Sequence, residues 1–485
     1  MEISKKYVMV VGLEVHAQLL TKSKAFAPDP NLYGSPPNTN VSPITLGHPG
    51  TLPQPNRMSL ELALRMGIAL KCTINRHTHF ARKNYFYADL PKGYQITQFP
   101  LPVCTDGQIT IKDADGNPKN IFIEKIILEE DSGKSIHDID PFSSLVDLNR
   151  AGVPLIEIVT GPDMRHPKEA YNYLTEIRKL VRYLDICDGN MEEGSLRCDA
   201  NVSLRPRGQK ELGTKVEVKN MNSIRHVQRA LEYEIERQQT ALENGEPIYQ
   251  ETRNFDAVTG TTVSMRGKEM AHDYRYFPEP DIPPIVISLE QISKVEETMP
   301  ELPAALHEKF IAEYGLSEYD ATILTSEKNF AHYFMEVIED TEQYKAATNW
   351  MIGPVRSYTN EQGIDISEFM LKPAQIAELV ELVEAGKMNF SIASTRLFSE
   401  LMKNPEVDPE RLAEQMNLIQ EGDEDLIRKI TRDAIAKYPQ KAADYRAGKK
   451  NLLGMFMGEI MRASKGKADP KKASRILTEE LENQE

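Results

Sequence analysis

The opening segment of the chain alternates apolar and polar side chains. In "VGLEVHAQL" (residues 11–19) the odd-numbered positions are apolar, whereas Glu14, His16 and Gln18 occupy even-numbered positions. A period of two predicts a β-strand with one buried face and one polar face. Side chains two residues apart on a strand lie about 6.5–7 Å from each other, so Glu14 and His16 are close enough to share a metal ion. A solvated strand face has the same pattern, and this segment alone leaves both interpretations open.

Similar patterns continue through residues 1–293. Strands are predicted at "KNIFIEKIIL", "PLIEIV", "SLRCDANVSLR" and "TKVEVK", and helices at "HPKEAYNYLTEIRKLVRYL" and "SIRHVQRALEYEIERQQTALENG". The second of these helices is expected to start after Ser223 as its N-cap and to stop at Gly245. Strands and helices interspersed in this way predict an α+β fold for this part of the chain.

Strand patterns vanish from about residue 294 onward. The segment "KPAQIAELVELVEAGK" has apolar residues at helical spacing, with Pro373 near its start and Gly386 beyond its end. A break at "KNPEVDPERL" separates a smaller helical tail. The predicted organisation is therefore an α+β domain over 1–293, an all-α domain over 294–408 and a helical tail domain over 409–485.

Composition excludes several classes of protein. The apolar runs are short and soon meet a charge, which argues against a transmembrane span. The four cysteines are scattered and form no C-x-x-C pair, so neither a disulfide framework nor a zinc finger is expected, and the reducing cytoplasm is the expected location. The net charge of −15 would argue against a nucleic-acid partner.

The distribution of that charge changes the picture. Between Arg428 and Arg475 there are fourteen Lys and Arg residues against four Asp and Glu residues, so the rest of the chain is strongly acidic. A basic C-terminal block on an acidic protein suggests a tail that meets a polyanion. The alternative is a solvated helical surface.

Carboxylates interrupt several of the predicted strands. If these strands are neighbours in one sheet, a single site gathers Glu14, His16, Glu130, Glu157 and Asp199. Oxygen ligands with one imidazole suit Mg²⁺ or Mn²⁺ better than zinc. Basic residues between them would suit phosphate oxygens, namely Arg82, Lys83, Lys134, Arg197 and Lys215. A charged, solvated sheet face with ion pairs is the alternative.

Familiar nucleotide and nucleophile motifs are missing. "LEEDSGKS" contains G-K-S, but Leu128 stands where a P-loop requires its first glycine, five residues before Gly133. The sequence has no G-x-G-x-x-G after a strand and no G-x-S-x-G. Any chemistry is therefore expected to rest on a metal ion and electrostatics and not on a covalent intermediate with the protein.

Several long motifs follow one another in a specific order: "GLEVHAQL", "RKNYFYADLPKGYQITQF", "LEEDSGKS", "LVDLNRAGVPLIEIV", "MEEGSLRCDANVSLRP", "DYRYFPEPD" and "GKKNLLGMFMGEIMRASKGKADP". Together they resemble the B subunits of the aspartyl/glutamyl-tRNA(Asn/Gln) amidotransferase, the GatB/GatE family of the GatCAB complex. The resemblance spans essentially the whole chain.

This resemblance implies a fold and an activity. It implies a catalytic cradle domain related to glutamine synthetase and guanidino kinases, a helical domain, and a YqeY-like tail that contacts tRNA. The family's complex uses ATP and ammonia to convert Glu-tRNA(Gln) to Gln-tRNA(Gln), or Asp-tRNA(Asn) to Asn-tRNA(Asn). A partner amidase makes the ammonia from glutamine, and a small third protein completes the GatCAB heterotrimer.

The resemblance also implies site residues. It places the Mg²⁺ and catalytic site on Glu14, His16, Glu130, Glu157 and Asp199. Of the basic residues picked out by the strand pattern, Arg82, Lys83, Lys134 and Arg197 are then expected to bind ATP. The cysteine zinc motif of some relatives is missing here, so no zinc is expected. Two other functions stay open at this point: a non-catalytic tRNA-binding scaffold, and a free-standing Mg²⁺-dependent carboxylate kinase or ligase. The choice between the two tRNA substrates also stays open.

Overall fold

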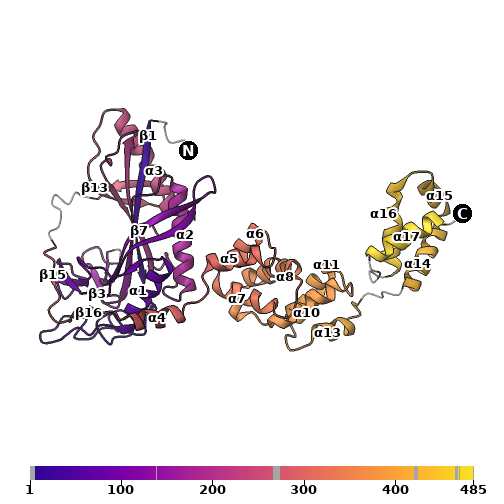
Figure 1. The fold of residues 1–485 in the computed structure, drawn as a ribbon, viewed down its shortest axis with the longest axis horizontal. Coiled ribbons are helices and arrows are strands. Elements are labelled where there is room, and N and C mark those ends of the chain that lie inside the picture. The colour runs from indigo at the N-terminus through magenta and orange to yellow at the C-terminus, as the bar shows by residue number, and fades with distance from the viewer. Residues whose placement is uncertain are drawn as a thin grey trace. The chain divides into compact units, whose positions relative to one another are not determined.

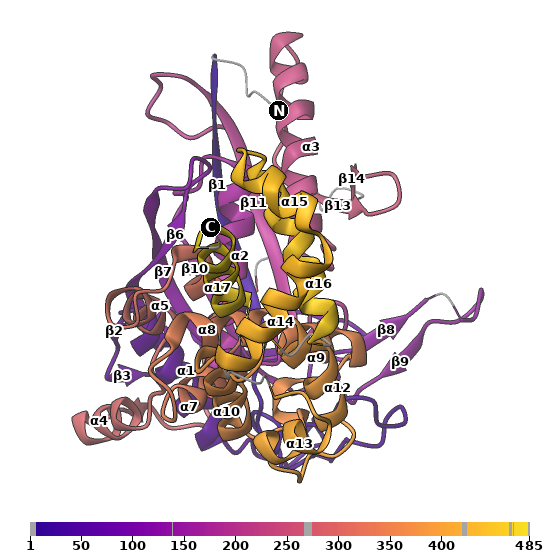
Figure 2. The same ribbon diagram turned by 90° about the vertical axis from the view of Figure 1, so that its right-hand side faces the viewer.

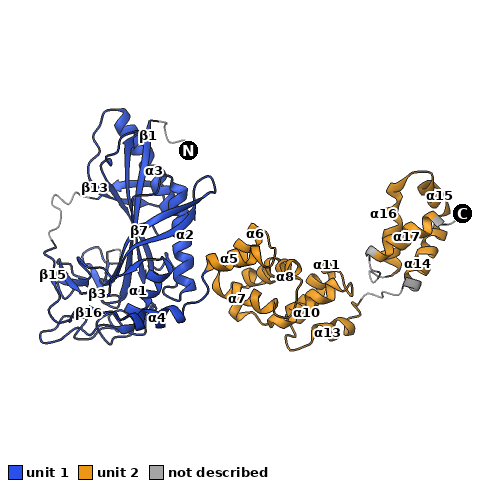
Figure 3. Cartoon of the chain, in the orientation of Figure 1, with its two compact units in different colours: residues 1–302 blue, residues 303–485 orange. Residues whose placement is uncertain are grey.

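The computed structural model describes residues 6–137, 139–265, 274–419, 424–464, 468 and 470–483. The chain forms two compact units, Met1–Leu302 and Pro303–Glu485 (Figure 3). The first unit combines a large sheet with helices, and the described part of the second is helical, which confirms the α+β and all-α prediction. In the described ranges, no helix combines the length and the apolar character that a membrane span requires.

A nine-stranded sheet is the framework of the first unit (Figure 1). Its long central strand β1 lies between β11 and β10, and every pairing is antiparallel except that of β12 with β13. In spatial order the strands are β14 (Thr261–Ser264), β13 (Glu251–Asp256), β12 (Val216–Lys219), β11 (Leu196–Pro206), β1 (Tyr7–Gln18), β10 (Pro154–Thr160), β7 (Pro118–Glu130), β6 (Cys104–Lys112) and β2 (Thr73–Ile74).

Helices cover one face of this sheet. The odd-numbered side chains of β1, such as Leu13 and Val15, are fully buried in one core with residues of α1 (Arg57–Ala69), α2 (Pro167–Tyr183) and α3 (Ile224–Glu243). Each such side chain contributes about 1.5–3 kcal/mol by leaving water, and a shift of one residue would turn all of them to the other face. The core therefore fixes the face on which Glu14 and His16 lie.

The helix ends follow the expected local signals. Ser223 Oγ accepts a hydrogen bond from the His226 backbone N–H at 3.1 Å, and Gly245 has φ of +77°, as expected for a residue that ends a helix. At α2 the cap is His166, whose ring Nδ1 accepts from the Lys168 N–H at 3.1 Å.

Three smaller sheets complete the first unit. The three-stranded sheet contains β15 (Phe277–Pro278), β4 (Ala81–Asn84) and β5 (Tyr94–Thr97), and β5 contacts β7 of the large sheet. Strand β16 (Ile285–Val286) pairs with β3 (His77–Thr78), and helix α4 (Leu289–Glu297) contacts α1. Strands β8 (Lys134–Ile136) and β9 (Leu145–Asp147) form a hairpin that projects from the sheet (Figure 2).

The second unit is a series of helices. The first group is α5 (Pro303–Ala312), α6 (Glu318–Leu324), α7 (Lys328–Val337), α8 (Tyr344–Trp350), α9 (Arg356–Gln362), α10 (Pro373–Glu384), α11 (Phe390–Ile392), α12 (Phe398–Leu401) and α13 (Pro409–Gln415). The second group is α14 (Glu424–Lys437), α15 (Pro439–Arg446), α16 (Leu453–Ala463) and α17 (Pro470–Asn483), which share a hydrophobic core cluster of their own. Helix α13 packs against α10, where the Glu410 N–H donates to Glu378 Oε1 at 3.0 Å.

Candidate metal and phosphate site

Strand register brings carboxylates of different segments onto the face of the sheet opposite the buried core. On β1, His16 stands opposite Glu157 of β10 on one side and Arg197 of β11 on the other. Two residues earlier, Glu14 stands opposite Asp199. The two polar residues of the opening strand therefore have neighbours from both adjoining strands.

His16, Glu129 and Glu157 form a first group, here called the His16 group. Their donor atoms all lie within 4.8 Å of one another. His16 Nε2 is 3.3 Å from Glu157 Oε2 and 4.0 Å from Glu129 Oε1. Glu129 is 4% exposed, so the water that would otherwise solvate its charge is nearly excluded.

Glu14, Asp199 and Glu217 form a second group, here called the Glu14 group. Their donor atoms also lie within 4.8 Å of one another. Asn201 Nδ2 donates to Glu14 Oε1 at 2.9 Å, while the Lys219 ammonium contacts Asp199 and lies 3.0 Å from Glu217 Oε1. Lys219 thus supplies part of the positive charge that these carboxylates require.

The pKa values in the two groups show a surplus of negative charge. Burial, and then the charge of Glu157, raise the pKa of Glu129 to about 7. Burial and the same charge also raise the pKa of Glu14. Burial would raise the pKa of Glu157 too, but the hydrogen bond and charge of His16 outweigh it and lower this pKa to about 2. A bound divalent cation would favour the ionised form of Glu129 and Glu14 against both burial and the repulsion from Glu157.

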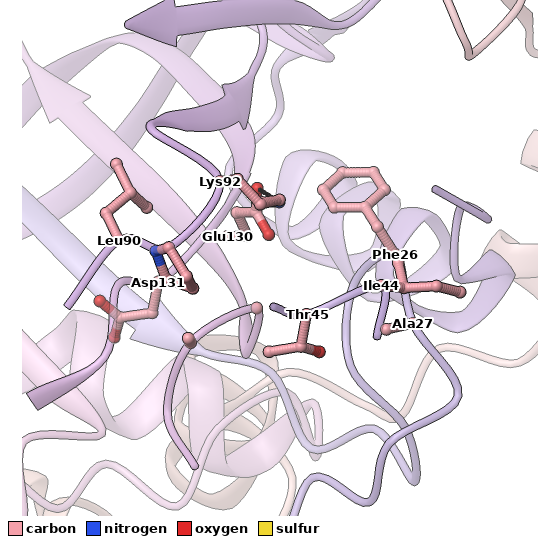
Figure 4. Close-up of a pocket in the computed structure, with 11 residues that line it drawn as sticks. Phe26, Ala27, Ile44, Thr45, Leu90, Lys92, Glu130 and Asp131 are labelled. Atoms are coloured by element: carbon pink, nitrogen blue, oxygen red, sulfur yellow. Dashed lines mark hydrogen bonds and ion pairs between the residues drawn. The ribbon is translucent and has the colours of Figure 1, made fainter. Parts of the chain in front are cut away.

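Glu130 lies apart from both groups. Its carboxylate contacts the Lys92 ammonium and accepts from the Ile96 backbone N–H at 2.9 Å. Figure 4 shows Glu130 and Lys92 together at a small cavity of about 10 Å³, which is enough for about one water molecule.

Strand parity explains this difference from the sequence-based expectation. Successive residues of a strand point to opposite faces, and β10 pairs with β7 so that Leu155, on the face of Glu157, stands opposite Glu129. Glu130 therefore faces the other side of the sheet. The five residues assigned to one site from the sequence do not form a single group in the described structure.

The predicted phosphate-binding residues occupy different surroundings. Burial would lower the pKa of Lys83, but the negative charges around it, those of Glu129 and Glu157 among them, outweigh burial and raise this pKa. Arg197 Nη1 donates to Asp131 at 2.7 Å. Two others are placed elsewhere: Arg82 forms ion pairs with Glu279 at 2.7 Å and Asp281 at 2.9 Å, and Lys134 is exposed on the β8–β9 hairpin.

Comparison with known proteins gives two matches that together cover most of the chain. Residues 9–293 match the family model described as the GatB/GatE catalytic domain, and residues 332–481 match the one described as the GatB domain. The chain belongs to the GatB/GatE family.

Full-length relatives of the family are similar over nearly their whole length, and three of them are named as B subunits of the aspartyl/glutamyl-tRNA(Asn/Gln) amidotransferase. The protein from Thermodesulfovibrio yellowstonii is 48% identical over 97% of this chain and 98% of its own. Those from Thermoanaerobacter pseudethanolicus and Chlorobium chlorochromatii are each 48% identical over 98% of this chain and 99% of theirs.

In this GatB/GatE chain, sequence reasoning missed two acidic members of the groups, Glu129 and Glu217, and the cation Lys219. The alternation of "TKVEVK" already puts Glu217 and Lys219 on one face. For Glu129 the sequence signal is ambiguous, because three acidic residues follow one another and only the pairing with β10 tells which one shares a face with Glu157.

The donor sets fit magnesium or manganese. Each group offers carboxylate oxygens, and the His16 group adds one imidazole, which is the ligand chemistry of Mg²⁺ and Mn²⁺. No cysteine belongs to a metal-ligand group in the described ranges. Burial raises the pKa of the Cys104 and Cys198 thiols well above the usual value, so both are neutral core residues.

Proposed function

We propose that this GatB/GatE chain carries the ATP-dependent step of a tRNA amidotransferase, a ligase that forms a carbon–nitrogen bond with glutamine as amido donor. Its substrate is the side-chain carboxylate of Glu-tRNA(Gln), Asp-tRNA(Asn) or both. The observation that carries this proposal is the pair of donor groups side by side on the open face of the sheet, in the domain that matches the family's catalytic domain.

The reaction needs two chemical steps. A carboxylate is a poor acceptor for ammonia, so one of its oxygens first attacks the γ-phosphorus of ATP, giving an acyl phosphate and ADP. Ammonia then adds to the acyl carbon and phosphate leaves, which yields the side-chain amide. Phosphoryl transfer requires mainly positioning and charge stabilisation from the protein, in agreement with a site without a covalent nucleophile.

The His16 group and the Glu14 group would hold Mg²⁺, which when bound neutralises the charge of the ATP phosphate oxygens. Relative to the set inferred from the sequence, Glu129 takes the place of Glu130 and Glu217 is added. Carboxylate-rich ligand sets of this kind favour magnesium or manganese over zinc in both groups.

Side chains around the groups complete the proposed site. Lys83, whose positive charge interacts with the charges of Glu129 and Glu157, would stabilise the negative charge of the transferred phosphoryl group. Arg197 is held by Asp131, which also accepts from Gln18 Nε2 at 2.8 Å, so the guanidinium is fixed at the end of β1.

The rest of the proposal follows the family. A partner amidase would supply the ammonia, a small third protein would complete the GatCAB heterotrimer, and the basic C-terminal helices would hold the tRNA body. The cradle would share the fold of glutamine synthetase and guanidino kinases, and the tail that of YqeY-like proteins. The aminoacyl-tRNA substrate places the reaction in the cytoplasm.

Mg²⁺-dependent ATP cleavage by the reconstituted complex tests this function. It is measured with and without Glu-tRNA(Gln) for the wild type, for Glu157→Ala and for a control, Glu246→Ala, an exposed residue beyond the end of α3 that belongs to neither donor group. Cleavage that requires the misacylated tRNA and is lost only in Glu157→Ala supports the proposal. Cleavage without tRNA would indicate a free-standing kinase, and indifference to Glu157 would leave the chain as a tRNA-binding scaffold.

A further inference from the structure

The three-stranded sheet of the first unit brings together aromatic side chains from three separate segments of the chain. Strand β5 pairs with β4, and β4 pairs with β15. At the end of β4, the Asn84 backbone N–H donates to the Tyr274 carbonyl oxygen at 2.9 Å, and Asn84 Nδ2 donates to that of Arg275 at 2.8 Å. These hydrogen bonds hold the segment before β15 against β4.

The aromatic rings of these segments follow one another in contact. Tyr87 packs on Tyr85 with 5.8 Å between the ring centres, and Tyr85 packs on Tyr274 at 6.0 Å. Tyr274 then meets Tyr276 at 6.0 Å, and Tyr276 stacks on Phe99 at 4.5 Å with 25° between the ring planes. This series is here called the aromatic row. Three of its members are accessible to solvent, since Tyr87 is 56% exposed, Tyr276 38% and Phe99 49%.

Strand β5 connects the aromatic row to the His16 group. A hydrogen bond joins the Thr97 side chain of β5 to the Glu129 carboxylate, and Phe99 follows Thr97 two residues later. At the other part of the row, the Tyr85 hydroxyl donates to Gln95 Oε1 of the same strand at 3.2 Å. The strand that supports the row therefore also contacts one of the proposed metal ligands.

The Lys83 ammonium interacts with both the row and the His16 group. It lies 5.0 Å from the ring centre of Tyr274, which is within the range of a cation–π interaction. Glu129 and Glu157 are among the negative charges that act on it. A carboxylate that follows the row toward the His16 group would therefore meet a cation there.

These features suit the end of a single-stranded nucleic acid. Exposed aromatic rings stack on bases of any sequence, and the row is longer than one base needs, which favours successive bases of a strand over a single nucleoside. The amino acid of an aminoacyl-tRNA is esterified to the last nucleotide, so its side-chain carboxylate is only a few bonds from that ribose. A carboxylate that reacts at the donor groups therefore brings the last nucleotides of the tRNA next to them.

We propose that the aromatic row binds the 3′-terminal nucleotides of the substrate tRNA by stacking, with Tyr276 and Phe99 as the main contacts, an assignment that rests on the function proposed above. The row then positions the ester so that its side-chain carboxylate reaches the His16 group. Glu-tRNA(Gln) and Asp-tRNA(Asn) both end in CCA, and stacking does not read the bases, so the row serves either substrate alike.

Variants of the row test this assignment. Tyr276→Ala and Phe99→Ala remove the stacking rings, whereas Tyr276→Phe keeps the ring and loses only the hydroxyl. Tyr249→Ala is the matched control, since Tyr249 is 72% exposed on the connection between α3 and β13. ATP cleavage by the reconstituted complex gives the KM for Glu-tRNA(Gln), for Asp-tRNA(Asn) and for ATP. Two competitors separate the end of the tRNA from its body: a glutamyl amide of the CCA trinucleotide, and tRNA(Gln) without its last three nucleotides.

Both alanine variants of the row are expected to raise the KM for each aminoacyl-tRNA roughly tenfold, equivalent to about 1.4 kcal/mol, and to weaken inhibition by the trinucleotide by the same factor. The KM for ATP, inhibition by the shortened tRNA and the thermal unfolding temperature should stay at their wild-type values. Tyr276→Phe and Tyr249→Ala should behave as the wild type.

Several results would overturn the assignment. A raised KM for ATP with an unchanged KM for tRNA would indicate the nucleoside of ATP as the ligand of the row. Weaker inhibition by the shortened tRNA would indicate the tRNA body, and failure of the alanine variants to assemble with the partner proteins in gel filtration would indicate a protein interface. Alanine variants that match the wild type, or an equal defect in Tyr276→Phe, would exclude ring stacking. A wild type without tRNA-dependent cleavage would instead refute the proposed function.

Discussion

Two adjacent glutamates on β7 have opposite roles in this structure. Glu129 faces His16 and Glu157, whereas Glu130 is held by Lys92 and the Ile96 N–H. We expect Glu129→Gln to reduce Mg²⁺-dependent ATP cleavage by at least about 100-fold, because a carboxamide is a much weaker ligand for Mg²⁺ than a carboxylate. Steady-state cleavage at saturating tRNA measures this loss.

Glu130→Gln is the matched variant, one residue away with the same change. We expect it to lower the free energy of unfolding by about 3 kcal/mol, because it leaves the partly buried Lys92 ammonium without its counter-charge. Chemical denaturation of the first unit measures that loss. Equal catalytic defects in the two variants at a temperature where both are folded would contradict the division of roles.

The shifted pKa values predict how the stability of the protein without Mg²⁺ depends on pH. Glu129 titrates near 4.5 in the unfolded chain and near 7 in the folded chain, so between these pH values the folded state binds more protons and stability falls as pH rises. The raised pKa of His16 acts in the same direction, since its stabilisation is present below pH 6.5 and is lost above it. The depressed pKa of Glu157 gives a stabilisation that is present above 4.5 and lost only as pH falls through about 2.

Mg²⁺ binds the ionised carboxylates, so its stabilisation should increase across the same window. We expect the rise in thermal unfolding temperature on adding Mg²⁺ to be larger at about pH 8 than at about pH 5.5. Thermal unfolding with and without the metal at both pH values measures this difference. Glu129→Gln is expected to flatten it, and a metal effect that is the same at both pH values would refute the prediction.

At the scale of elements, one buried carboxylate connects helix α3 to the edge of the sheet. Glu234 is 0% exposed, and its carboxylate accepts hydrogen bonds from Nε and Nη2 of Arg237, each at 2.9 Å. Arg253 of β13 lies 3.0 Å from the same carboxylate. Glu251 is the other acidic partner of both arginines, at 2.7 Å from Arg253 and 4.0 Å from Arg237. Removal of Glu234 therefore leaves two partly buried guanidinium groups with a single carboxylate between them.

We expect Glu234→Ala to lower the stability of α3, β13 and β14 by about 3–5 kcal/mol. Hydrogen exchange of the amides in these elements measures the change directly. Glu236→Ala, on the exposed side of the same helix, is the control and should change exchange by less than about 0.5 kcal/mol. Unchanged protection in Glu234→Ala would show that packing alone holds the helix.

At the scale of the whole molecule, the C-terminal helices are built to fold around their own core. Residues from Ile427 to Leu481 form a separate hydrophobic cluster. Ion pairs use part of the basic block, such as those of Arg428 and Arg432 with Glu480 at 2.7 and 2.9 Å. Lys429 and Lys441 are exposed, and the predicted basic residues Lys465 and Lys467 lie outside the described residues.

Removing the chain beyond residue 419 should therefore separate two functions. We expect the truncated protein to bind Mg²⁺ and ATP as the full chain does, since the donor groups lie in the first unit. Its affinity for tRNA should fall, and the dependence of that affinity on salt should become shallower, because fewer phosphates are neutralised. Filter binding over a range of salt concentrations measures both.

The double variant Lys429→Glu and Lys441→Glu tests the charge separately from the fold of the tail. It should reproduce the shallower salt dependence while the tail stays folded. Unchanged tRNA affinity in both the truncation and the double variant would show that the basic block is only a solvated surface.

Much of the fold follows from local patterns that are visible in the sequence. The alternation around Glu14 and His16 predicts β1, and Ser223 with Gly245 predicts the ends of α3, because side-chain period and capping chemistry act within a few residues. The strand order does not follow from them. Pairings such as β1 with β10 join residues more than a hundred positions apart, and only burial of the shared core selects them.

For the site, the amino-acid pattern establishes the kind of chemistry: carboxylates and one histidine on polar strand faces, without a P-loop or a nucleophile motif. The folded arrangement selects which of them meet. It divides the acidic residues into the His16 and Glu14 groups, places Glu129 and not Glu130 beside His16, adds Glu217, and engages Arg82 with Glu279. The physical reason is register: which face a residue shares depends on the pairing of distant strands, and a difference of one position reverses it.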